Sequence, residues 1–143
     1  MKPGLEIGAM HEHRMTVQPS HTVPALFSDL DAFPEMPQVF ATAFYTGLME
    51  WACVEMIRPF YDDGEQSLGT HVDFSHVAPT LPGQQVTVTA RLAERDGKFL
   101  WFDVSAHDGV DLIGQGRHQR ALIGSNKFMD RLAQKRAVVG AGV

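Results

Sequence analysis

Hydrophobic and polar positions alternate differently in the two halves of the chain. Residues 39–57 are apolar almost all round, which predicts a buried helix. In the second half, apolar side chains recur at every second position, which predicts four strands: 67–78, 86–92, 99–107 and 112–123. A weaker alternation predicts a first strand at 10–17. Strands grouped beside one long helix indicate an α+β fold with an antiparallel sheet covering the helix.

The connections between these elements have their own signals. Four prolines break any regular element between residues 18 and 38, and this segment is either a lid over a pocket or an ordinary connector. Asp96-Gly97 predicts a tight hairpin. We expect Ser125 to cap a short amphipathic helix reaching Leu132, followed by a loose tail at 137–143. The apolar residues of the proline-rich segment that need burial are Val23, Leu26, Phe27, Phe33 and Met36.

Length and charge narrow the functional class. The 143 residues fit a single domain, 1–143, and a formal net charge of −5 without a Lys/Arg cluster argues against nucleic acid as a partner. The lone Cys53 cannot form an intrachain disulfide, and the N-terminus lacks an apolar core of signal-peptide length, so a cytoplasmic location is expected. There is no P-loop, G-x-G-x-x-G or G-x-S-x-G motif.

Glu50 lies near the middle of the apolar helix. Its charge argues against a membrane span, because a carboxylate there would cost roughly 2.5 to 3.5 kcal/mol. Buried carboxylates must be paired, hydrogen-bonded or neutralised. Glu50 therefore either acts in catalysis or anchors a neighbouring amide or basic side chain. The helix flank that carries it comprises Thr42, Thr46, Met49, Glu50 and Cys53.

Histidines and an arginine on the strands are further candidates. His11 and His13 share a face of the first strand, and two solvated histidines are favoured over a metal site because no further ligands stand at suitable spacing. His76 follows Leu68, Thr70, Val72 and Phe74 on the apolar face of its strand.

Arg120 shares a strand face with Gly114, Gly116 and His118, and the two glycines would let a backbone or a helix approach closely. Arg120 could bind an anionic ligand group, pair with a buried carboxylate or remain solvated at the end of its strand. The sequence alone leaves these three alternatives open.

Four segments strongly resemble the fluoroacetyl-CoA thioesterase family, whose members have the hotdog fold, a curved antiparallel sheet around one helix. The likeness spans nearly the whole chain. The segments are Gly47-Leu48-Met49-Glu50-Trp51-Ala52-Cys53, Ser67-Leu68-Gly69-Thr70, Val86-Thr87-Val88-Thr89-Ala90 and Val104-Ser105-Ala106-His107-Asp108-Gly109-Val110-Asp111.

The resemblance implies hydrolysis of an acyl-CoA by Thr42, Glu50 and His76, with no metal and with coenzyme A only as part of the substrate. It implies that the Gly69 amide holds the thioester carbonyl and that Arg120 lines the pocket. Apolar substrate contacts are expected from Phe33, Met36 and Phe40.

The residues at two positions differ from the family pattern. Met36 replaces a phenylalanine of the pocket lid, and Ala43 replaces a glycine beside the reactive threonine. Because methionine adapts to irregular shapes, we expect a short acyl group without strict fluoroacetyl selectivity.

Glu50 could attack the carbonyl or activate water. In one ideal helix, however, Thr42 and Glu50 would lie about 12 Å apart along its axis. Either the helix entry bends, or a second subunit completes the site, and the resemblance favours a homodimer. The alternative functions are a hotdog enoyl-CoA hydratase or dehydratase and a non-catalytic acyl-CoA-binding domain.

Overall fold

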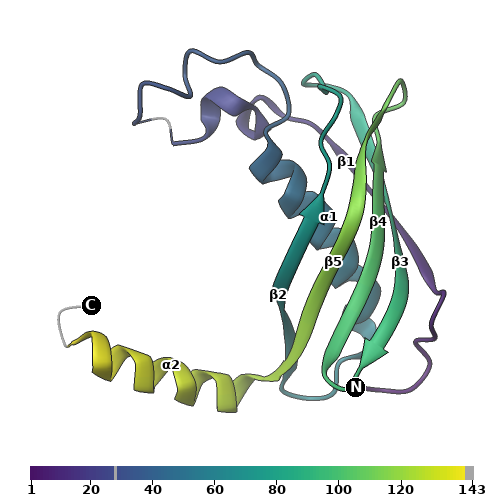
Figure 1. The fold of residues 1–143 in the computed structure, drawn as a ribbon, viewed down its shortest axis with the longest axis vertical. Coiled ribbons are helices and arrows are strands. Elements are labelled where there is room, and N and C mark those ends of the chain that lie inside the picture. Colours follow the sequence, from purple (N-terminus) through teal and green to yellow (C-terminus); the bar gives the residue numbers. More distant parts are fainter. Residues whose placement is uncertain (28, 141–143) are drawn as a thin grey trace.

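The computed structural model describes residues 1–27 and 29–140, in which one curved antiparallel sheet wraps around a helix (Figure 1). The strand order is β1-β3-β4-β5-β2, and every neighbouring pair is antiparallel. The predicted α+β fold with one long central helix is confirmed. The elements are β1 (Met10–Thr16), α1 (Thr42–Ile57), β2 (Glu65–Phe74), β3 (Gln85–Asp96), β4 (Phe99–His107), β5 (Leu112–Gly124) and α2 (Ser125–Val139).

The core lies between α1 and the concave face of the sheet. Met49, Ala52 and Ile57 of α1 are fully buried, as are the inward residues of β3 that the period-two pattern selected: Val86, Val88, Ala90 and Leu92. Complete burial of each large apolar side chain contributes about 1.5–3 kcal/mol. No described helix is long and apolar enough to cross a membrane.

The ends of α2 differ from the prediction. The capping residue is Gly124, with no side-chain hydrogen bond, so the assignment of Ser125 as the cap is wrong. The helix continues to Val139 instead of ending near Leu132, because its last turns consist of good helix formers such as Ala, Gln, Lys and Arg. Residues 141–143 of the predicted tail lie outside the described residues. The hairpin at Asp96-Gly97 is confirmed.

An irregularity in β2 changes which side chains face α1. The pairing with β5 shifts between Gly69 and His71, so that Thr70 has no partner of its own. Such a bulge reverses the alternation of a strand. Gly69 pairs with Arg120, whereas Val72 pairs with His118. After the bulge, Val72 and Phe74 lie on the inward face, as predicted. Before the bulge the prediction is wrong, because Ser67 and Gly69 face inward in place of Leu68 and Thr70.

The two glycines of β5 permit the close approach that the sequence predicted. A Cβ atom on Gly114 would overlap the Ser75 carbonyl oxygen, and one on Gly116 would overlap the Asp73 carbonyl oxygen. Any larger residue at either position would therefore push the two chain segments apart. The end of β2 and the segment after it can thus lie directly against β5. That segment leads from β2 to His76.

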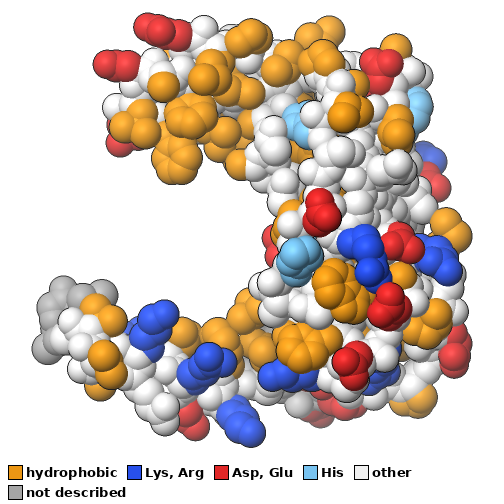
Figure 2. All heavy atoms as spheres, in the orientation of Figure 1, with side chains coloured by type: hydrophobic (Ala, Val, Ile, Leu, Met, Phe, Trp, Pro, Cys, Tyr) orange, Lys and Arg blue, Asp and Glu red, His pale blue; other side chains and the backbone are white. Residues whose placement is uncertain are grey.

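Three parts of the molecule surround an open concavity. They are the free edge of β2, helix α2 and the loop before α1 (Figure 1). Hydrophobic side chains gather on the loop and on α2 (Figure 2). Phe27 is 63% exposed and Met36 is 44% exposed. The expectation that these two residues are buried is therefore wrong within one chain, because the loop projects away from the sheet.

His11 and His13 are not solvated as predicted. Both point from β1 towards α1, and the His13 ring centroid lies 4.2 Å from that of Trp51. The Nε2 atoms of both histidines are buried and have no hydrogen-bond partner among the described residues. Within those residues, no group of three or more His, Cys, Asp or Glu side chains is arranged to hold a metal ion.

Candidate functional site

Thr42 and His76 form one half of the candidate site. Thr42 is the first residue of α1, and His76 lies in the extended segment just after β2. The Thr42 Oγ1 and His76 Nδ1 atoms are 2.8 Å apart, a hydrogen-bond distance. The pair borders a hollow of about 320 Å³, which Phe40 and Val23 also line. The structure therefore brings together two of the three predicted catalytic residues.

The surroundings of His76 keep its imidazole neutral. Burial lowers its pKa below the ordinary value of 6.5, although a backbone hydrogen bond with Ala78 acts in the opposite direction. The Tyr45 ring lies 4.6 Å from the His76 ring, measured between centroids. A neutral imidazole beside a hydroxyl can accept a proton and return it, which is what a proton relay requires.

Glu50 and Arg120 form the other half. Glu50 Oε1 lies 2.7 Å from Arg120 Nη1, so the two side chains are joined by a hydrogen-bonded ion pair. Arg120 is 5% exposed, whereas the Glu50 side chain is 39% exposed. Of the three alternatives for Arg120, the structure therefore has the pairing with a carboxylate. The prediction that Glu50 is deeply buried is wrong, because its side chain lies on the part of α1 that opens to solvent.

Residues of β2 define the surroundings of this ion pair. Arg120 donates from Nε to Ser67 Oγ and from Nη2 to the Ser67 carbonyl oxygen, both at 2.9 Å. A Cβ atom on Gly69 would lie only 2.6 Å from Glu50 Oε1. Glycine at this position therefore lets the carboxylate reach the backbone of β2.

The two halves are separate within one chain. Helix α1 begins at Thr42 without a bent entry and continues through Glu50. Two residues that are eight positions apart in an α-helix have Cα atoms about 12 Å apart along its axis. Of the two explanations given for this spacing, the bent helix entry is therefore excluded. Among the described residues, the Glu50 side chain forms its hydrogen bond with Arg120, and the Thr42 side chain forms its hydrogen bond with His76.

The predicted apolar substrate contacts have different positions. Phe40 is buried beside Tyr45, with 6.2 Å between ring centroids, and it lines the hollow next to Thr42. Phe33 lies in the projecting loop, 5.6 Å from Phe27 between ring centroids. Met36 lies in the same loop and is exposed. Of the three predicted apolar contacts, Phe40 is therefore the one that adjoins the Thr42 and His76 pair within this chain.

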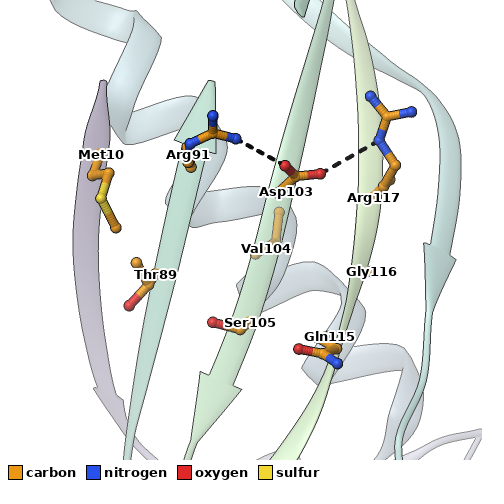
Figure 3. A pocket seen from close by; sticks show the side chains of 9 residues that line it. All are labelled: Met10, Thr89, Arg91, Asp103, Val104, Ser105, Gln115, Gly116 and Arg117. Carbon is orange, nitrogen blue, oxygen red and sulfur yellow. Dashed lines mark hydrogen bonds and ion pairs between the residues drawn. The ribbon is translucent and has the colours of Figure 1, made fainter. Parts of the chain in front are cut away.

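A wider hollow of about 490 Å³ lies on the opposite, convex face of the sheet (Figure 3). Asp103 stands between two arginines there, 3.1 Å from Arg91 Nη1 and 3.4 Å from Arg117 Nε. Arg117 also binds Glu94 and stacks on Trp101. These charges satisfy one another across neighbouring strands, and none of the predicted catalytic residues lies here.

Sequence reasoning missed two residues of the site. Ser67 contacts Arg120 twice, and its hydroxyl lies 2.6 Å from the Tyr61 hydroxyl. His118 lies 3.2 Å from Arg120 Nη1 through its Nε2 atom. The bulge hid Ser67, because simple alternation placed it on the outer face. His118 had a signal, since it shares a strand face with Arg120, but no role was assigned to it.

Comparisons with known proteins show the family to which the chain belongs. The model of the fluoroacetyl-CoA-specific thioesterase family matches residues 17–126. The fluoroacetyl-CoA thioesterase of Streptantibioticus cattleyicolor is 48% identical over 135 residues, which cover 94% of this chain and 97% of that protein.

Two solved structures extend the likeness to the fold. A structure of fluoroacetyl-CoA thioesterase has a TM-score of 0.90 at 47% identity, with 93% of this chain and 98% of that chain covered. A thioesterase superfamily member from Thermus thermophilus has a TM-score of 0.83 at 30% identity, with 96% and 99% covered. The hotdog fold is thus confirmed.

Arg120 is buried beside Glu50, whereas Arg117 on the convex face is exposed, and this difference leads to a stability prediction. We expect Arg120→Met to lower the free energy of unfolding by about 2–4 kcal/mol, because it leaves the Ser67 acceptors and the Glu50 carboxylate without their donor. Arg117→Met is the matched control on the convex face, and it should cost less than about 1 kcal/mol because exposed ion pairs contribute little. Urea unfolding measures both values, and equal losses would contradict the assignment.

Proposed function

Because the chain belongs to the fluoroacetyl-CoA-specific thioesterase family and is an acyl-CoA thioesterase of the hotdog fold, we propose that it hydrolyses a short-chain acyl-CoA without strict fluoroacetyl selectivity. The relatives reported above are thioesterases, which favours hydrolysis over the hydratase and binding-domain alternatives. One observation supports the assignment of catalytic residues: two polar pairs lie at the two ends of one helix segment. Thr42 is paired with His76, and Glu50 is paired with Arg120.

The proposed chemistry uses groups that the chain already provides. Glu50 either attacks the thioester carbonyl, forming a mixed anhydride and releasing the CoA thiolate, or takes a proton from an attacking water. His76 transfers protons, and Thr42 orients the carboxylate or the substrate. The Gly69 amide stabilises the developing oxyanion. The reaction needs no cofactor, since coenzyme A is part of the substrate, and we propose a cytoplasmic location.

We propose that two subunits complete each site. One helix keeps Thr42 and Glu50 apart, so a shared site needs Glu50 from a second copy of the chain to face Thr42 and His76. Several features support such a homodimer: β2 is an edge strand with exposed Leu68 and Val72, and the apolar loop and α2 border the same concavity (Figures 1 and 2). An unpaired edge with apolar side chains is a ready pairing surface.

Substrate selectivity in this proposal depends on the loop. Met36 is a flexible thioether on a projecting segment, so it can adapt to acyl groups of different shape. A rigid aromatic ring at the same position would define a narrower pocket. The substitution of phenylalanine by methionine in the lid therefore supports a broader acyl range than the family name indicates.

A thiol-release screen tests reaction type and selectivity together. With acyl-CoAs of graded length and polarity, we expect release of free CoA thiol from short acyl groups. Catalytic efficiencies for acetyl- and fluoroacetyl-CoA should agree within roughly tenfold. Glu50→Gln should lower kcat roughly 10²- to 10⁴-fold. Strong preference for the fluorinated substrate would refute the proposed breadth, and a change in enoyl absorbance without thiol release would indicate hydration.

Subunit complementation tests the shared site. Thr42→Ala and Glu50→Gln chains are each expected to be nearly inactive alone. If they are unfolded together and refolded as a mixture, random pairing makes half of the dimers mixed, and one of the two sites in each mixed dimer is intact. We therefore expect about a quarter of wild-type activity. Activity no higher than that of the separate variants would show that each site uses residues of one chain.

Oxygen-18 water separates the two chemical routes. We expect the covalent route, in which water opens the anhydride at the Glu50 carbonyl and leaves label in the Glu50 side chain after a single turnover. Mass spectrometry of the peptide containing Glu50 and of the released acid locates the label. Label in the released acid alone would count against this route and favour direct activation of water.

A further inference from the structure

His118 occupies a fully buried position in β5 with both ring nitrogens engaged. Its Nδ1 atom lies 2.7 Å from the His71 carbonyl oxygen, and its Nε2 atom lies 3.2 Å from Arg120 Nη1. A carbonyl oxygen only accepts and a guanidinium only donates. The imidazole therefore carries its proton on Nδ1 and offers the lone pair of Nε2 to Arg120.

The surroundings of this ring favour its neutral form. The rings of Phe74 and Phe102 lie 6.1 and 6.5 Å from it, measured between centroids. Burial lowers the pKa of His118 below 6.5, and the positive charge of Arg120 lowers it further, while the His71 carbonyl and Glu50 act in the opposite direction. At neutral pH the ring therefore keeps a free lone pair for the arginine.

The bulge in β2 explains why the His71 carbonyl is available. A bulge disrupts the hydrogen-bond ladder locally, and the pairing of β2 with β5 shifts between Gly69 and His71. The His71 carbonyl oxygen, at the end of that shift, accepts its bond from the His118 ring. The same irregularity that turns Gly69 towards Glu50 thus also selects the tautomer of His118.

Arg120 connects His118 to Glu50. Its Nη1 atom carries two hydrogens, and it lies 2.7 Å from Glu50 Oε1 as well as 3.2 Å from His118 Nε2. Ser67 accepts from the other two nitrogens. The guanidinium is thus held on two sides, and one N–H remains directed at the carboxylate. Among the described residues, the Glu50 side chain contacts Arg120 Nη1 and, at 4.0 Å, His118 Nε2, and both contacts are made by Oε1. This leaves Oε2 for the reaction.

We infer that His118 is a positioning residue of the thioesterase reaction, which sets the direction of the Glu50 carboxylate by accepting a hydrogen bond from Arg120. This inference rests on the proposed role of Glu50. It assigns His118 no contact with the substrate. Its contribution is to kcat, because a misdirected carboxylate still allows the acyl-CoA to bind but rarely meets the carbonyl carbon in the correct geometry.

Two substitutions separate the two hydrogen bonds of His118. In His118→Gln the amide oxygen can take the place of Nε2 and accept from Arg120, whereas the bond to His71 is lost. In His118→Asn the amide nitrogen can take the place of Nδ1 and donate to His71, but nothing reaches Arg120. Each variant loses one hydrogen bond, so thermal unfolding should show similar stability losses for both.

We expect His118→Gln to keep kcat within about threefold of wild type, while His118→Asn lowers kcat roughly ten- to a hundredfold with little change in KM, as for loss of one hydrogen bond to a charged group. Steady-state thiol release measures both constants. Equal losses of kcat in the two variants, or losses that follow their unfolding temperatures, would overturn the inference. An unchanged kcat in His118→Asn would also overturn it.

The hydrogen bonds of His118 can also be measured without substrate, so that this inference is tested independently of the proposed function. Nitrogen-15 NMR of the wild-type protein should show His118 protonated on Nδ1 only, and Arg120→Met should shift the Nε2 resonance by removing its donor. A proton on Nε2, or no shift in the variant, would overturn the arrangement. If no acyl-CoA releases thiol while the NMR result holds, the proposed function fails and the hydrogen-bond geometry stands.

Discussion

The ion pair between Glu50 and Arg120 is the interaction on which the arrangement of the candidate site depends. A guanidinium that is almost completely buried needs acceptors for its N–H groups, and Glu50, Ser67 and His118 provide them. Glu50 in turn cannot rotate freely towards solvent without leaving this cation behind. The Glu50 carboxylate is thus held at one place by the hydrogen-bonding requirements of Arg120.

The same constraint keeps the two halves of the site apart. Arg120 is fixed to β5 and β2, so it holds the Glu50 carboxylate against these strands, near the middle of α1. Thr42 instead binds His76, at the beginning of the helix. A rigid helix cannot shorten that distance. The apolar loop, the edge of β2 and α2 remain exposed around the concavity, and a second copy would cover them while bringing the missing group (Figure 2). The homodimer proposed above would account for both the division of polar groups along one helix and the uncovered surface.

Much of the fold could be predicted because its elements follow simple periods. The alternation of Val86, Val88, Ala90 and Leu92 identified β3, and Asp96-Gly97 identified its hairpin. The period fails at Thr70, since a one-residue bulge depends on tertiary pairing and leaves no regular signal in the sequence. Phe27 and Met36 were expected inside for a similar reason: hydrophobicity indicates that a side chain needs cover, but not whether its own chain provides it.

Prediction of the site had a comparable limit. Residue types and resemblance selected Thr42, Glu50, His76 and Arg120, but only the structure identifies which of them touch. The bulge turns Ser67 and Gly69 inward and gives His118 a carbonyl acceptor. In a regular β2 that kept the pairing of His71 with Gln119, Thr70 would stand opposite Arg120 and Leu68 would take the inward place of Ser67. The hydroxyl that accepts from Arg120 Nε would then be lost. One additional residue in an edge strand therefore turns Ser67 and Gly69 towards the ion pair between Glu50 and Arg120.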